Sequence, residues 1–198
     1  MSGRFLFLKN TVGTPGAIAA PPNGHEIAVL EQPAFTPDAL ETVCGLLLGQ
    51  HLDEYHLGTL RPGLDAFLAR GGAVATMGPI AVPYMSILRP HRPEGSGRRD
   101  DWVLEIARDH PIVDGVSARD ITFRKGVVGF WARGSIAPPD DARIVTRFAA
   151  TGAPADWVWH GPHGAKLFVH PGNDVWGYAQ EPNSSARVFA QLLDWMAA

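Results

Sequence analysis

Runs of consecutive apolar residues mark the strands expected in the first half of the chain. Gly45-Leu-Leu-Leu-Gly49 shows no polar alternation, which is typical of a strand covered on both faces, as in a parallel sheet. Similar short runs predict three further strands, at Arg4–Lys9, His25–Leu30 and Ala73–Met77. These four segments therefore predict a sheet that is buried on both sides.

Helical periodicity appears between these strands. Leu60–Arg70 carries apolar residues on one helical face and is followed by Gly71 and Gly72, which favour a helix end. Thr36 and Pro37 suit the N-cap and the first position of another helix, which we expect to reach about Cys44. The alternation of strands and helices predicts a right-handed, doubly wound sheet.

The second half of the chain breaks this alternation. A short helix is expected at Trp102–Arg108 and a C-terminal helix at Ser184–Met196, while the charged, Pro- and Gly-rich segment Arg89–Asp101 predicts a mobile loop. Gly161-Pro-His-Gly164 is typical of a hairpin turn. Strands are predicted at Gly126–Ala132, Arg143–Phe148, Trp157–His160 and Lys166–His170.

Composition narrows the class of protein. A length of 198 residues predicts a single domain, 1–198, with one core. The net charge of −3 gives no reason to expect nucleic acid or an anionic membrane as a partner. No apolar stretch approaches the ~20 residues of a membrane span, and the N-terminus lacks a signal-peptide pattern. The single cysteine, Cys44, is expected to be a buried packing residue, so the sequence predicts a cytoplasmic protein.

Two motifs carry a resemblance to a known family. They are Asp109-His-Pro-Ile-Val-Asp-Gly115 and the late strand that ends in His170-Pro171. With the strand layout, they resemble the class I glutamine amidotransferase-like superfamily, and within it the non-canonical, ThuA-like branch. The resemblance implies a three-layer α/β/α, flavodoxin-like fold with an added β-hairpin.

The departures from that family exclude its usual chemistry. Active amidotransferases carry a Gly-x-Cys-x-Gly elbow after one strand, whereas this chain reads Thr76-Met-Gly78-Pro79 there. Their later strand ends in His-Pro-Glu, and here Gly172 replaces the acid. Without a thiolate no covalent thioester can form. The sequence therefore argues against a Cys-dependent glutamine amidotransferase.

His170 is the residue that could still carry catalysis. Pro171 favours an extended conformation at His170 and, with Gly172, fits a type II turn. A nearby carboxylate can orient an imidazole and raise its basicity, so we name His170 and Asp174 as candidate catalytic residues. The alternative is that the two residues only close a structural turn.

Further polar residues follow other predicted strands. Because the carboxyl ends of parallel strands share one edge, His51, Asp53 and Gly78 are expected to line one concavity with His170. The candidate ligand-binding residues are His51, Asp53, Gly78, Arg133, Asn173 and Trp176, with Trp176 placed at the pocket rim. The same polar residues suit a solvated loop and a helix cap. The spacing of the histidines does not favour a metal ion, and no cofactor is expected.

Three functions remain open. The first is a catalytically degenerate protein that binds a small polar, carbohydrate-like ligand. The second is a non-covalent hydrolase or lyase with His170 as general base and Arg133 or backbone amides at the oxyanion. The third is a structural or regulatory subunit with a vestigial pocket. A polar, open pocket at His170 favours the first two, and a pocket filled by apolar side chains favours the third. The sequence leaves open whether the protein forms a homo-oligomer.

Overall fold

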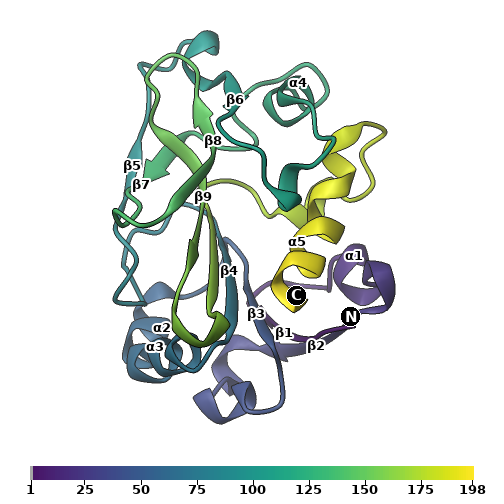
Figure 1. Ribbon diagram of the computed structural model, residues 1–198, viewed down its shortest axis with the longest axis vertical. Coiled ribbons are helices and arrows are strands. Elements are labelled where there is room, and N and C mark those ends of the chain that lie inside the picture. The colour runs from purple at the N-terminus through teal and green to yellow at the C-terminus, as the bar shows by residue number, and fades with distance from the viewer. Residues whose placement is uncertain (1) are drawn as a thin grey trace.

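The centre of the fold is an eight-stranded mixed sheet with the strand order β2-β1-β3-β4-β10-β9-β8-β6 (Figure 1). The structure is a computed structural model that describes residues 2–198. Its first five strands run parallel and the last three are antiparallel to their neighbours. The parallel strands are β2 (Glu26–Glu31), β1 (Arg4–Lys9), β3 (Gly45–Leu48), β4 (Ala73–Met77) and β10 (Lys166–His170). The others are β9 (Pro154–His160), β8 (Arg143–Phe148) and β6 (Leu104–Ile106).

The parallel part has the 2-1-3-4-5 order of flavodoxin-like folds, with β10 as its fifth strand. A separate two-stranded ribbon pairs β5 (His91–Pro93) with β7 (Gly134–Ile136). The helices are α1 (Gly16–Ala19), α2 (Glu54–Thr59), α3 (Arg61–Ala69), α4 (Ala118–Thr122) and α5 (Arg187–Ala197).

Alternation along the strands builds a core on each face of the sheet. In β1, Phe5 and Phe7 belong to one cluster and Leu6 and Leu8 to the other, because successive strand residues point to opposite faces. Helix α5 covers the first face, and α2 and α3 cover the second. Figure 1 shows these helices on opposite sides of the sheet. The fold is therefore a three-layer α/β/α sandwich.

Three predicted elements were wrong, each because of contacts that sequence periodicity does not show. The helix expected from Thr36 to Cys44 is only a 3-10 turn, Pro37–Leu40. Cys44, its expected last residue, instead donates its backbone amide to the carbonyl of Arg4, the first residue of β1. Trp102–Arg108 forms no helix, because its centre is β6, paired with β8. Gly126–Ala132 forms no strand, because Gly126 and Gly129 adopt positive φ.

Cys44 also differs from its prediction, because it is exposed rather than buried. Its thiol donates to the Arg4 carbonyl over 3.2 Å. The residue precedes β3, so it lies at the amino end of the parallel strands, away from the edge where their carboxyl ends meet. Within residues 2–198, the helices are all too short or too polar to cross a bilayer.

Candidate functional site

The carboxyl ends of β3, β4 and β10 meet at one edge of the sheet. Leu48 pairs with Thr76, and Met77 pairs with His170, so the three strands end in step. Just beyond them the Gly78 amide donates to the His170 carbonyl over 2.9 Å. Gly78 has a φ of +94°, and a Cβ there would lie 2.6 Å from the Cβ of Gln50. Glycine is therefore needed where β4 turns beside the end of β3.

A cavity of about 380 Å³, which we call the edge cavity, opens at these strand ends. Residues after all three strands line it, together with the segment that precedes β7 and one residue of β5. None of the described residues that line it is Asp or Glu. The lining residues are Gln50, Pro79, His91, Gly129, Phe130, Ala132, Arg133, Pro171, Gly172 and Asn173.

His170 lies beneath this cavity, fully buried, with both ring nitrogens occupied. Nε2 lies 2.8 Å from the Asn173 carbonyl, which can only accept, so Nε2 carries the proton. Nδ1 lies 2.6 Å from Oδ1 of Asp156, which is itself 1 % exposed. Neither nitrogen presents a lone pair to the cavity, and in this arrangement the ring is not placed to take a proton from a ligand.

Asp156 is the carboxylate that orients His170, where the sequence pointed to Asp174. Its Oδ2 accepts hydrogen bonds from the Trp131 indole, at 2.7 Å, and from the Thr146 hydroxyl, at 2.5 Å. Asp174 instead accepts from the Gln50 amide at 2.9 Å. Burial raises the pKa of the Asp174 carboxyl, while the Gln50 amide acts in the opposite direction. Asp174 therefore ties the loop after β3 to the loop after β10.

Gly172, which stands where the family has its acid, is pressed against the backbone of Trp131. A Cβ at residue 172 would lie 1.3 Å from the Trp131 carbonyl oxygen and 2.9 Å from Nε2 of His170. The Trp131 ring packs edge-on against His170, with the ring centroids 4.9 Å apart. The segment that carries Trp131 thus fills the space in which an acidic side chain would stand.

Among the six predicted ligand-binding residues, four do not line the edge cavity: His51, Asp53, Gly78 and Trp176. His51 and Asp53 are exposed, and Asp53 is the N-cap of α2, where its carboxylate accepts from the His56 amide at 3.0 Å. Trp176 was expected at the rim, but it is buried and packs against Phe7, with the ring centroids 5.2 Å apart. Asp53 thus serves helix capping and Trp176 core packing, while the exposed His51 accepts a hydrogen bond from the Asn10 side chain at its carbonyl, at 3.1 Å.

Arg133 and Asn173 do line the cavity, and Gly78 directly precedes Pro79, which also lines it. The residues that sequence reasoning missed are Phe130 and His91, together with Asp156 below the cavity. Phe130 was assigned to a strand, and its 36 % exposure is visible only in the structure. The signal for Asp156 was a lone acid between the apolar residues Ala155 and Trp157, a pattern that predicts a buried polar partner.

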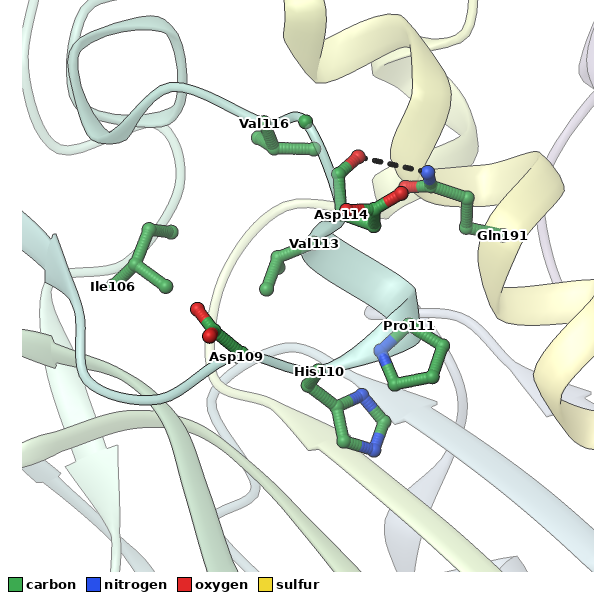
Figure 2. A pocket seen from close by; sticks show the side chains of 9 residues that line it. Ile106, Asp109, His110, Pro111, Val113, Asp114, Val116 and Gln191 are labelled. Carbon is green, nitrogen blue, oxygen red and sulfur yellow. Dashed lines mark hydrogen bonds between the residues drawn. The ribbon is translucent and has the colours of Figure 1, made fainter.

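A second cavity, of about 690 Å³, lies beside the Asp109–Gly115 motif, and we call it the motif cavity (Figure 2). Ile106 of β6 and Gln191 of α5 complete its wall. His110 caps the 3-10 turn Pro111–Val113, because its Nδ1 accepts from the Ile112 amide at 3.3 Å. Gln191 donates from Nε2 to the Asp114 carbonyl over 2.9 Å. These contacts hold the motif against α5.

Comparisons with known proteins bear on the fold alone. No family model matches the chain, and no curated protein matches it by sequence. The mmIFT52 N-terminal domain matches it in structure with a TM-score of 0.62 and 11 % identity, covering 98 % of this chain and 96 % of that one. A ThuA-like protein from Bacteroides uniformis matches with a TM-score of 0.56 and 8 % identity, covering 98 % and 90 %. The chain has a ThuA-like fold. Within residues 2–198, the acidic, His and Cys side chains form no group of three or more that could hold a metal ion.

The contact between Gly172 and Trp131 can be tested by adding one methyl group. Gly172→Ala should lower the free energy of unfolding by about 3 kcal/mol or more, because the new Cβ collides with backbone rather than with a movable side chain. Gly177→Ala is the matched control, since a Cβ there meets nothing within 4 Å. Urea unfolding followed by circular dichroism measures both. Equal stability of the two variants would contradict the close contact between Gly172 and the Trp131 backbone.

The histidines beside α5 predict a loss of stability in acid. Burial lowers the pKa of His110 to about 4, with the charges of His160 and Arg143 adding to the effect. An unfolded histidine titrates near 6.5, so the unfolded state binds more protons between pH 6.5 and 4. The free energy of unfolding should therefore fall as the pH drops through this window.

His110→Asn tests this because asparagine is also a good cap but does not titrate there. Urea midpoints measured from pH 7.5 to 4 should fall less steeply in the variant than in the native chain. Parallel curves over the whole range would show that His110 does not contribute.

Proposed function

We propose that the chain is a catalytically degenerate member of the amidotransferase-like superfamily that binds a small polar, carbohydrate-like ligand in the edge cavity. The observation that carries this proposal is the lining of the cavity. Planar polar side chains and one exposed aromatic ring surround a space at the carboxyl ends of parallel strands, where α/β folds bind their ligands.

The polar groups suit hydroxyl-rich molecules. The amides of Gln50 and Asn173 can both donate and accept, as sugar hydroxyls do. Burial lowers the pKa of His91, so this ring is neutral at pH 7 and also offers one donor and one acceptor. Phe130, which is 36 % exposed, offers an apolar surface for the C–H face of a sugar ring.

Arg133 adds a preference for ligands that carry an acidic group. Its Nε donates to the Gly129 carbonyl at 2.9 Å, and its guanidinium lies 5.2 Å from the Trp102 ring centroid. These contacts fix the side chain in place. Within the described chain no carboxylate lines the cavity or pairs with Arg133. A sugar acid could therefore pair with the guanidinium, while the charge of Glu94, which accepts from Ser135, acts on His91.

The non-covalent hydrolase has less support. His170 as general base would require its Nε2 contact with the Asn173 carbonyl to break, together with an opening in the segment of Trp131. The buried state of His170 favours a structural or regulatory subunit. That function does not explain why an open, polar cavity lies next to this histidine.

Binding can be measured by NMR titration with three probes of similar size: glucose, glucuronate and the polyol sorbitol. We expect glucuronate to bind most tightly. Arg133→Ala should weaken glucuronate binding about tenfold, the loss expected for one charge-assisted hydrogen bond, and should weaken glucose binding less. Asn173→Ala should weaken both, and it leaves intact the backbone carbonyl that holds His170.

Arg92→Ala is the control, because Arg92 is an exposed neighbour of His91 that does not line the cavity. If none of the probes binds at millimolar concentration, the subunit becomes the better explanation. If the native chain converts a probe to product, the proposed binding function is wrong and the non-covalent hydrolase or lyase becomes the better explanation.

A further inference from the structure

The motif cavity contains two carboxylates that the rest of the fold does not use. Asp109 and Asp114 are both exposed, and both line the cavity. Within residues 2–198 neither carboxylate takes part in an ion pair. The Arg187 guanidinium of α5 lies beside Gly115, which also lines the cavity, but among the described residues it forms no ion pair with either acid. The two negative charges are therefore available to a ligand.

The wall between the two acids is apolar. Ile106, Val113 and Val116 form it, with Val113 and Val116 buried and Ile106 half-buried. Figure 2 shows the Asp109 carboxylate beside Ile106 and Val113, with Asp114 on the opposite side of Val113. A ligand that spans the cavity would thus meet a negative charge, an aliphatic surface and a second negative charge.

The remaining polar groups of the cavity add no positive charge. Gln191 turns its nitrogen to the Asp114 carbonyl, and its Oε1 is buried without a hydrogen-bond partner among the described residues. His110 is neutral at pH 7, because its pKa is lowered to about 4, so it adds no positive charge. None of the residues that line the cavity is Lys or Arg.

We propose that the motif cavity binds an aliphatic amine, with an ammonium group on Asp109 or Asp114 and the hydrocarbon chain against Ile106, Val113 and Val116. A volume of about 690 Å³ lies in the range of small-molecule sites. A diamine uses both carboxylates and binds more tightly than a monoamine. This site is separate from the edge cavity and does not depend on its function.

The test is a calorimetric titration of the full chain at low salt with four probes of matched chain length: cadaverine, pentylamine, pentanol and glutarate. Cadaverine should bind most tightly and pentylamine next, at least about tenfold tighter than pentanol, and glutarate should not bind. Raised salt should weaken the binding of both amines, because exposed charges are screened.

Asp109→Asn and Asp114→Asn keep the shape of each side chain and remove its charge. Each should weaken cadaverine binding about three- to tenfold, and the double variant should bind cadaverine no better than pentanol. Asp140→Asn is the matched control, since Asp140 is exposed and lies outside the cavity. The proposal is overturned if pentanol binds as tightly as pentylamine, if no amine binds, or if Asp140→Asn weakens binding as much as the two cavity variants.

Discussion

The buried contact between His170 and Asp156 is the interaction on which the rest of this architecture depends. It joins β10, the last parallel strand, to β9, the first antiparallel one, and Thr146 of β8 and the indole of Trp131 complete the hydrogen bonds of Asp156. An uncompensated buried charge costs several kcal/mol, so the sheet past β10 is stable only with these partners around Asp156. The requirement brings the segment of Trp131 over the end of β10, and Gly172 must then lack a side chain.

The same contact separates this protein from enzymes that use a carboxylate–imidazole pair. In a catalytic pair, one ring nitrogen is oriented by the acid and the other faces the substrate. Here the second nitrogen donates to the Asn173 carbonyl, and the ring is covered. Nδ1 of His170 thus contacts an orienting acid, as in such a pair. Nε2 instead holds the loop after β10, whose residues Pro171, Gly172 and Asn173 line the edge cavity. An open cavity therefore lies beside a fully buried histidine.

The strands of the parallel sheet could be predicted because each is a short apolar run, and β3 and β4 are buried on both faces, whereas the edge strand β2 is only partly covered. Elements decided by distant pairing could not: β6 is a strand because Phe148 lies opposite Leu104, which local periodicity does not reveal. The site shows the same limit. Asp174 was chosen because it is near His170 in sequence, whereas Asp156 reaches it from the neighbouring strand of the hairpin.

The two cavities have opposite electrostatic character, although the net charge of −3 gives no hint of it. Among the described residues, Arg133 lines the edge cavity without Asp or Glu, and Asp109 and Asp114 line the motif cavity without Lys or Arg. All three residues come from the long connection between β4 and β10, which also carries β5 to β9. Loops and insertions vary more freely than buried strands, so the linings of both cavities lie mainly on the part of the chain that can change while β1, β3, β4 and β10 stay constant. Two solved structures share this fold with this chain at 8 and 11 % identity, so the fold by itself does not determine what either cavity binds.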